Sequence, residues 1–528
     1  MSDTPATGGA GAGRLDGLLA DAARRHPART AVVDGDTVLG YARLDALVTE
    51  TADALRRHGV TDGTRVGVRL HRGHQAIVAI YGALRAGAVV APLDAEEPPA
   101  RTARILRGGG LTRLLAAPDT LARARESVPD GWQEAELPHG LVCLSSPHPA
   151  DGPQPPSAAA RPAGGYVLFT SGSTGWPKGV LLSHENVLHF ARWAAREFAL
   201  GPDDRIGAQA AFTFDLSTFD LFSTAAAGAS VHLLPTAVRA FPRSVVDWLD
   251  SERITALYAV PTLYQMLMHR GNLAAAPPRA LRVAAYAGEP FPPAVLEKYL
   301  TVLPDTAFYN LYGPTETNVC TYERVPPGWR ASDPQTIGAA IDGVTVDLFD
   351  DDGRRSGSEG EICVAGPTVL GGYLVDGRLH DPATELRFAD GPRRAYRTGD
   401  LARRTPDGRL RLLGRRDHQI KRDGHRIDLL DVESTLAELP GVETCCVVAD
   451  TGPQGAQDGA PDGVRLTAHV TGDAGLDADT LVAALSERLP RFMLPDEVVL
   501  ADSLPTTRHG KVDRKKLLVT THTPEVTR

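Results

Sequence analysis

The sequence of 528 residues is short of lysine, cysteine and long apolar runs, and each shortage excludes a class of protein. Only six of its 56 basic residues are lysines, the net charge is −9, and no basic block occurs, so a nucleic-acid-binding protein is not indicated. No apolar stretch reaches the roughly 18 residues that a membrane-spanning helix needs. The five cysteines show no CxxC or metal-ligand spacing, which favours a reducing, cytoplasmic setting over a disulfide framework.

The length and the local patterns predict at least two domains of mixed α/β structure, because one hydrophobic core rarely serves so long a chain. Residues 1–13 are rich in glycine and alanine and lack the apolar segment of a secretory signal, so a disordered tail is expected. Short apolar runs then alternate with amphipathic stretches, which predicts strands at 31–33, 65–68, 88–91 and 166–170 and helices at 44–57 and 75–86. Surface loops are predicted at 148–165 and 451–463, and short strands with glycine turns at 336–413.

A loop rich in glycine, serine and threonine follows the predicted strand at 166–170. The segment reads YVLFTSGSTGWPKGV over residues 166–180, and its small residues let backbone N–H groups approach an anion closely while hydroxyls add donors. It is not a Walker A loop, because Lys178 stands between Pro177 and Gly179. The loop predicts a phosphate site of another type.

This string resembles the signature of the adenylate-forming superfamily, which includes acyl-CoA synthetases, luciferases and the adenylation domains of nonribosomal peptide synthetases. Further motifs of that superfamily occur in their expected order along the chain: LRAGAVVAPLD (84–94), FDLS (214–217), NLYGPTET (310–317), GEICVAG and GGY (360–373), YRTGDL (396–401), GRRDHQIKRDGHRIDLLDVE (414–433), LPRFMLP (489–495) and LPTTRHGKVDR (504–514). The match as a whole covers residues from about 15 to 516. One motif could arise by chance, but the ordered set could not.

The resemblance implies a large N-terminal core of αβ layers with a small β-rich subdomain, over residues 14–414. A hinge at 415–418, centred on Asp417, would lead to a small mobile C-terminal α+β domain at 419–528. The implied reaction joins a carboxylate to the α-phosphate of ATP, and a thiol then takes the acyl group. Lys511 would be the catalytic residue, bridging the substrate carboxylate and the α-phosphate. Gly424 would line a passage for the pantetheine thiol.

The resemblance also assigns a nucleotide site. Asn310 would bond adenine N6, Tyr312 would stack on the ring, Thr315 would touch the α-phosphate, and Asp400 would accept both ribose hydroxyls. Glu316 would help to hold Mg²⁺ through an oxygen ligand. The remaining residues assigned to the nucleotide are Thr170, Ser171, Gly172, Ser173, Thr174, Gly175, Lys178, Gly288, Glu289, Gly313 and Arg415.

Asp215 identifies the class of acid, because amino-acid-activating members of the superfamily place an aspartate there to pair with the substrate ammonium. A carboxylate facing a cation rejects substrates that lack the amine. The rest of the implied pocket is uncharged apart from Lys511 and consists of Leu216, Phe219, Tyr258, Ala285, Ala287, Leu311, Val319 and Cys320. This set resembles that of stand-alone proline-activating enzymes, which supply pyrrole-2-carboxyl groups to antibiotics. Ala285 replaces a larger aliphatic residue of that pattern, which leaves a methylated or larger-ring analogue open beside L-proline.

The acceptor is expected on another chain, because no GGxS-like attachment motif for phosphopantetheine occurs in the sequence. A separate holo peptidyl carrier protein is favoured over coenzyme A, and a need for a small accessory activator protein stays open. Two alternatives to an amino acid:carrier-protein ligase remain. One is an acyl- or aryl-CoA ligase, against which Asp215 argues. The other is a non-catalytic binding module, against which Lys511, Glu316 and Asp400 argue.

Overall fold

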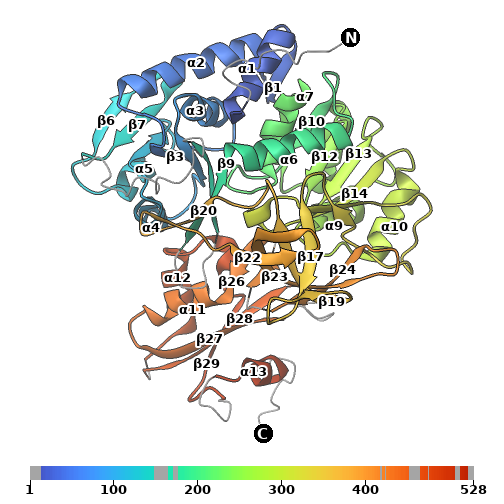
Figure 1. Cartoon of the computed structure of the whole chain (residues 1–528). Coiled ribbons are helices and arrows are strands. Elements are labelled where there is room, and N and C mark those ends of the chain that lie inside the picture. Colours follow the sequence, from blue (N-terminus) through green and yellow to red (C-terminus); the bar gives the residue numbers. More distant parts are fainter. Residues whose placement is uncertain are drawn as a thin grey trace. The chain divides into compact units, whose positions relative to one another are not determined.

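The computed structural model describes residues 13–147, 164–170, 177–416, 419–422, 424–450, 464–473, 475–505 and 512–520 (Figure 1). By its internal contacts the chain divides into two compact units. The first comprises residues 1–95, 106–169 and 179–416, and the second comprises 417–528 together with the short stretches 96–105 and 170–178. The predicted hinge falls at this division, but Arg415 ends a strand of the first unit, and the predicted domain limits stay a prediction.

The first unit contains a nine-stranded sheet, and the described strands in its middle are parallel. Its order is β16 (Ala339–Ala340), β15 (Thr321–Arg324), β14 (Ala307–Tyr312), β13 (Val283–Tyr286), β12 (Ala256–Ala259), β10 (Arg205–Ala208), β11 (Ser230–Leu233), β1 (Thr30–Asp34) and β2 (Thr37–Gly40). The helices along this part of the chain are α6 (His184–Glu197), α7 (Thr224–Ala227), α8 (Pro242–Ser251), α9 (Pro261–Arg270) and α10 (Pro293–Val302).

The strands β12 and β13 are buried on both faces, and each face belongs to a different apolar cluster. Because successive side chains of a strand point to opposite faces, Tyr258 and Ala285 join the larger cluster while Leu257 and Ala284 join a second one with α8, α9 and α10. The larger cluster also takes in α1 (Leu15–Arg25), α2 (Tyr41–Arg57) and α3 (His74–Arg85). This burial fixes which side chains of the parallel strands face the site.

The second nine-stranded sheet has the order β21 (Arg378–His380), β20 (Gly372–Val375), β9 (Lys178–Ser183), β8 (Gly165–Thr170), β4 (Val89–Leu93), β3 (Arg65–Arg69), β5 (Arg113–Ala116), β7 (Val142–Ser145) and β6 (Gln133–Glu136). The helices α4 (Pro99–Gly109) and α5 (Leu121–Ser127) lie between its strands in the chain. A smaller antiparallel sheet follows, with β18 (Arg355–Ser356), β17 (Thr345–Phe349), β19 (Glu359–Ala365), β23 (Gly391–Arg404) and β22 (Thr384–Phe388) in order and β24 (Leu410–Arg415) paired to β23.

The second unit contains a hairpin of β25 (Gln419–Arg422) and β26 (His425–Asp428) and a sheet of β27 (Val442–Asp450), β28 (Arg465–Gly472) and β29 (Glu497–Leu500). Its helices are α11 (Leu429–Ala437), α12 (Ala478–Ser486) and α13 (Arg514–Thr520). It has its own apolar core, in which Val432 and Leu436 of α11 pack with Leu466 and Ala468 of β28. Asp428 caps α11 by accepting a hydrogen bond from the Leu430 amide, which explains why the helix begins there.

The predicted α/β class, with a β-rich portion and a smaller C-terminal domain, is confirmed. The predicted strands and helices are found with shifted ends. Helix α2 begins at Tyr41 rather than at residue 44, because β2 ends at Gly40 and the Tyr41 side chain is buried with its hydroxyl donating to the Ala229 carbonyl. Gly165, predicted in a loop, opens β8 because it pairs with Val89. Residues 1–12, 148–163 and 451–463 lie outside the described residues.

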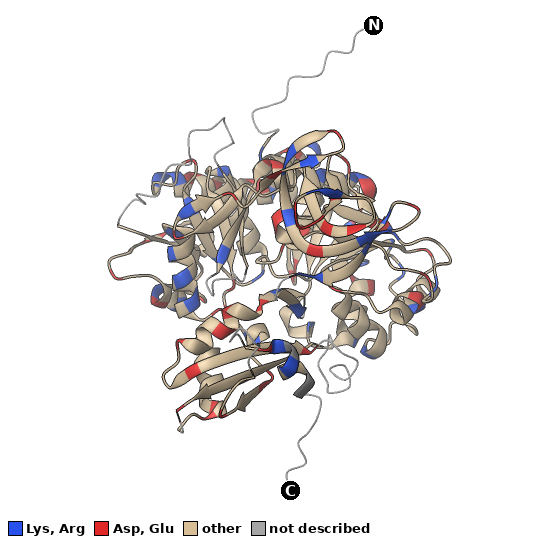
Figure 2. Cartoon of the chain, turned by 60° about the horizontal axis from the view of Figure 1, so that its bottom comes forward, with Lys and Arg blue, Asp and Glu red and all other residues tan. Residues whose placement is uncertain are grey.

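Figure 2 shows acidic and basic residues interspersed along the described elements rather than gathered into one basic face. Over the part of the chain that the structure covers, no helix combines the length and apolar character needed to cross a membrane.

Candidate functional site

The predicted amino-acid pocket residues come together in one apolar cluster. All eight uncharged members are buried: Leu216, Phe219, Tyr258, Ala285, Ala287, Leu311, Val319 and Cys320. Tyr258 and Ala285 are paired in register between β12 and β13, and the Phe219 ring meets the Tyr258 ring edge-on, with centroids 5.6 Å apart. The parallel sheet therefore brings Tyr258 and Ala285 together with the segment around Phe219.

Asp215 is half-buried next to this cluster and accepts a hydrogen bond from Thr315. The Thr315 hydroxyl donates to Asp215 Oδ2 at 2.7 Å, although the two residues are 100 positions apart in the chain. Asp215 precedes Leu216 of the apolar wall, and Thr315 opens a short 3-10 turn, Thr315–Thr317, after β14. The residue predicted to bind the ammonium and the one predicted to touch the α-phosphate are thus in direct contact.

The turn that carries Thr315 is held tightly. A Cβ atom at Gly313 would lie 1.6 Å from the Asn318 carbonyl oxygen, so only glycine fits there. Asn318 itself has a φ of 49° with a ψ of −150°, a strained combination that glycine adopts far more readily than other residues, and its side-chain amide donates to the Thr218 hydroxyl at 3.3 Å. These constraints fix Thr315 relative to the Asp215 segment.

Tyr312, Asp400 and Arg415, three of the predicted nucleotide residues, form one hydrogen-bonded group. The Tyr312 hydroxyl donates to Asp400 Oδ2 at 2.6 Å, and Arg415 Nη1 donates to Asp400 Oδ1 at 2.6 Å. Asp400 and Arg415 are register partners on β23 and β24, which places both at the same edge of the small sheet. Burial and the neighbouring Asp400 charge hold the pKa of Tyr312 well above its ordinary value, so the phenol stays a donor.

Asn310 lies two residues before Tyr312 on β14. Its Nδ2 donates to the Thr336 carbonyl at 2.8 Å, which fixes the orientation of the side-chain amide. The Oδ1 atom then remains as an acceptor for a donor group of a ligand. Gly288 follows β13 with a φ of +97°, which favours glycine. Glu289 accepts from the Thr262 amide and hydroxyl, at 3.1 and 2.7 Å, and so caps the first turn of α9.

Glu316 is the predicted metal ligand and is fully buried. The Tyr373 hydroxyl donates to its Oε1 at 2.7 Å, and Tyr373 also shares a hydrogen bond with the Tyr396 hydroxyl at 2.9 Å. Among the described residues no group of three or more His, Cys, Asp or Glu side chains could hold a metal ion. A single oriented carboxylate suits Mg²⁺ that arrives with a nucleotide, because this ion keeps several waters and takes other ligands from phosphates.

The predicted phosphate loop is described only at its two ends. Thr170 ends β8, and its buried hydroxyl has no hydrogen-bond partner among the described residues, as expected of a donor kept for an anion. Lys178 opens β9 and is half-buried. Ser171, Gly172, Ser173, Thr174, Gly175, the predicted hinge residue Asp417 and the predicted catalytic residue Lys511 lie outside the described residues. Gly424 has a φ of +80° in the turn between β25 and β26.

Cys320 lies in the same apolar cluster as the other predicted pocket residues. It is fully buried, its thiol donates to the Tyr312 carbonyl at 3.4 Å, and burial raises the pKa of the thiol to about 12. A thiol held so strongly protonated is a poor nucleophile at neutral pH, which is consistent with the prediction that Cys320 lines the pocket rather than reacts.

Sequence reasoning did not single out Asp220, which follows Phe219 in a short π-helical turn, Phe219–Ser223. Its carboxyl group is fully buried, and neither oxygen has a hydrogen-bond partner among the described residues. Burial raises the pKa of Asp220 well above its ordinary value, and Arg72 opposes this only in part. The π-helical turn, a feature often found at functional sites, gave no signal in the sequence.

Asp220 predicts a pH dependence of stability. A carboxyl group with a raised pKa in the folded state binds a proton that the unfolded chain releases above about pH 4, so its contribution to stability falls as pH rises, by up to about 1.4 kcal/mol per pH unit. Asp220→Asn removes this pH-dependent contribution. In denaturant titrations, the free energy of unfolding of the variant relative to that of the parent should therefore be higher at pH 8 than at pH 5. An identical difference in unfolding free energy at both pH values would show that Asp220 is charged in the fold.

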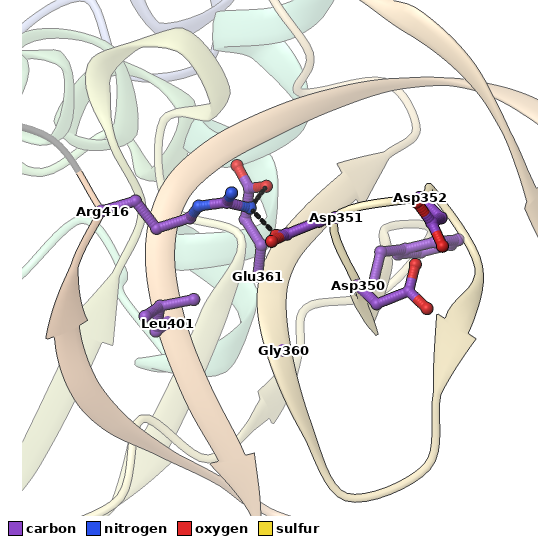
Figure 3. A pocket seen from close by; sticks show the side chains of 8 residues that line it. Asp350, Asp351, Asp352, Gly360, Glu361, Leu401 and Arg416 are labelled. Carbon is purple, nitrogen blue, oxygen red and sulfur yellow. Dashed lines mark hydrogen bonds and ion pairs between the residues drawn. The ribbon is translucent and has the colours of Figure 1, made fainter.

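A second feature not foreseen lies at the end of the first unit. Figure 3 shows Arg416 reaching Asp351 and Glu361, at 2.7 and 3.3 Å from its Nη1. Glu361, whose side chain is only 6% exposed, also accepts hydrogen bonds from the Arg397 guanidinium and the Gly399 amide. Arg416, a residue of the predicted hinge at 415–418, is thereby bound to the small sheet.

Glu361→Gln should lower the free energy of unfolding by about 1–3 kcal/mol. The reason is that Arg397 and Arg416 both lose the buried carboxylate charge with which they pair. Glu359→Gln on the same strand is the matched control, since Glu359 pairs with the largely exposed Arg403 and its loss should cost at most about 1 kcal/mol. Denaturant unfolding of the two variants compares them directly. Equal losses would mean that the Glu361 network is no stronger than a surface pair.

Comparison with known proteins fits this geometry. The sequence family described as AMP-binding enzyme matches residues 19–374, and the AMP-binding enzyme C-terminal domain matches residues 431–511. An L-proline--[L-prolyl-carrier protein] ligase of Pseudomonas fluorescens is 37% identical over 506 residues, covering 93% of this chain and 96% of the relative. A protein of the same name from Streptomyces coelicolor is 33% identical over 535 residues, covering 95% of each chain.

Solved structures agree in fold. The crystal structure of IdnL1 matches with a TM-score of 0.77 at 29% identity, covering 93% of this chain and 99% of that one. Holo-PA1221, described as a nonribosomal peptide synthetase protein containing adenylation and peptidyl carrier domains, matches with a TM-score of 0.75 at 25% identity, covering 96% and 84%. With the family match spanning most of the sequence and the predicted motifs in place, this chain belongs to the AMP-binding enzymes.

Proposed function

We propose that this chain activates L-proline with ATP to give prolyl-AMP and transfers the prolyl group to the phosphopantetheine thiol of a separate peptidyl carrier protein. The observation that carries the proposal is the half-buried carboxylate of Asp215 beside a lining of eight buried, uncharged side chains. A carboxylate so placed binds an ammonium, and the apolar lining suits an uncharged ring. The names of the relatives from Pseudomonas fluorescens and Streptomyces coelicolor support the same substrate and acceptor.

In the first half-reaction a carboxylate oxygen of proline attacks the α-phosphorus, the bond from that phosphorus to the bridging oxygen breaks, and pyrophosphate leaves. Asp215 would hold the ammonium, which directs the carboxylate towards the turn that carries Thr315. Lys511 would bridge the carboxylate and the α-phosphate, where negative charge accumulates. In the second half-reaction the carrier thiol loses its proton, its sulfur bonds to the acyl carbon, and AMP leaves.

The nucleotide would be held by the hydrogen-bonded group of Tyr312, Asp400 and Arg415. Asp400 can accept from the ribose hydroxyls with the lone pairs that Tyr312 and Arg415 leave, since a carboxylate offers about four acceptor positions. The oriented Asn310 amide presents Oδ1 towards a donor such as an exocyclic amine. Thr170, whose hydroxyl has no hydrogen-bond partner within the described part of the chain, would donate to a phosphate oxygen.

Mg²⁺ would be held by Glu316, whose orientation Tyr373 fixes, together with phosphate oxygens and water. When bound, the ion neutralises charge on the phosphates. The residues present fit this arrangement, because Mg²⁺ in nucleotide sites commonly takes only one or two protein carboxylates.

Amino-acid-dependent exchange between ATP and pyrophosphate tests the proposal. The panel should include L-proline, pipecolate, methylated prolines, benzoate and short fatty acids. Exchange strongest with L-proline is expected. Exchange with only the acids that lack an amine would replace the proposal with an acyl- or aryl-CoA ligase, and no exchange with any acid would favour a non-catalytic binding module.

A further inference from the structure

A cavity of about 210 Å³ lies in the first unit beside Asn310, the residue proposed to bind adenine N6. One side of the cavity is a row of three side chains on neighbouring strands. Tyr286 of β13 and Glu323 of β15 are the register partners of Asn310 on β14, and all three line the cavity. Register partners point to the same face of a sheet, so the sheet presents this row to one space.

The rest of the lining is mostly apolar. Leu296 of α10, Val325 and Trp329 line the cavity and belong to the second apolar cluster, as Tyr286 does. Two of these four side chains are aromatic, and aromatic rings pack well against another ring in an edge-on or offset arrangement. The lining therefore favours an apolar group, and an aromatic ring in particular.

The charged side chains at the cavity are paired with one another. Arg409 Nη1 donates to Glu323 Oε1 at 2.6 Å, and the Thr336 hydroxyl donates to Glu323 Oε2 at 3.0 Å. Asp407 pairs with Arg409 Nε at 3.2 Å. Because both oxygens of Glu323 already accept hydrogen bonds, this carboxylate does not call for a cationic ligand.

Asn310 connects the cavity with the proposed nucleotide site. Its Nδ2 is held by the Thr336 carbonyl at 2.8 Å, so Oδ1 is the atom that would accept from the exocyclic amine of adenine. That amine carries two protons, and only one of them is donated to Oδ1. A substituent can therefore replace the other proton without breaking this hydrogen bond, and it would start at the edge of the cavity that Asn310 lines.

The volume of the cavity decides what kind of group it can take. Pockets for whole small ligands usually measure roughly 300–1,000 Å³. A space of about 210 Å³ instead suits one ring attached to a ligand that is held elsewhere. We infer that the cavity is a subsite for an apolar substituent on adenine N6, so that this chain accepts ATP with a benzyl group at that position. The inference rests on the proposed function, which places adenine at Asn310.

Isothermal titration calorimetry on the full chain, with Mg²⁺ and either ATP or N6-benzyl-ATP, tests the inference. The parent should bind the benzyl analogue with a Kd no more than about threefold above that for ATP, because burial of the ring offsets its loss of freedom. Val325→Phe should raise the Kd for the analogue by about tenfold or more, since its added ring occupies the cavity, and should leave the Kd for ATP within about twofold. Leu296→Phe fills the same cavity from α10 and should have the same effect.

Val302→Phe is the matched control, because Val302 of α10 packs against the same apolar cluster but is not among the described residues that line the cavity. It should leave both Kd values as in the parent, and thermal unfolding shows whether each variant is folded. A parent that binds ATP but not the analogue overturns the inference alone. So do cavity-filling variants that bind the analogue as the parent does, or that lose affinity equally for both nucleotides. A parent that binds neither nucleotide overturns the proposed function and the inference with it.

Discussion

Asp215→Asn should lower kcat/KM for L-proline in the exchange reaction by about 100-fold or more, because the ammonium loses a charged and hydrogen-bonded partner in a partly buried site. The substitution preserves the size of the side chain and an acceptor for Thr315, so the loss reports the charge. Initial rates of ATP–pyrophosphate exchange over a range of proline concentrations give the value.

A substrate that lacks the amine sharpens this test. Cyclopentanecarboxylate has the shape of proline without a cationic centre, and the parent should reject it strongly because Asp215 would be left unpaired. Asp215→Asn should narrow the preference for proline over this acid. Asp220→Asn is the matched control, since it removes a carboxyl five residues along the same segment and should leave the preference intact. A preference unchanged in Asp215→Asn would remove Asp215 from amine recognition.

Lys511→Ala should reduce prolyl-AMP formation by about 100- to 1,000-fold, the usual loss when one group that stabilises transition-state charge is removed. Transfer from preformed prolyl-AMP to the carrier thiol should proceed near the parent's rate, because the Lys511 side chain is assigned a role in the first half-reaction only. Exchange and single-turnover transfer assays separate the two steps.

Lys298→Ala is the control for this pair of assays, because Lys298 is an exposed lysine on α10 outside the family motifs. Both half-reactions should be unaffected by it. An equal loss of adenylation and transfer in Lys511→Ala would contradict a division of labour in which different faces of the C-terminal domain serve the two steps.

The sequence predicted the fold class because the local signals were strong and agreed with each other. Short apolar runs such as 65–68 form parallel strands that are buried on both faces, and the ordered motifs predict that Tyr312, Asp400 and Arg415 share one site, as their hydrogen bonds show that they do. Element ends were less well predicted, since the start of α2 depends on the burial of Tyr41 against the Ala229 carbonyl, a contact 188 residues away.

Contacts between distant segments could not be read from the chain. The bond between Thr315 and Asp215 joins residues 100 positions apart, and neither motif indicates that its side chain meets the other. The raised pKa of Asp220 and the charge shared by Arg397 and Arg416 at Glu361 arise from burial, which depends on the packed structure. Motif spacing therefore predicts which residues belong to the site, whereas their hydrogen bonds and pKa shifts depend on tertiary packing.

Loading of a carrier protein tests the central claim most directly. A holo peptidyl carrier protein is incubated with this chain, ATP, Mg²⁺ and L-proline, and its intact mass is measured. The carrier should gain the mass of one prolyl group, and this gain should require ATP and the phosphopantetheine arm. A carrier that stays unmodified while coenzyme A becomes acylated, or that gains an acyl group only from acids without an amine, would contradict the account.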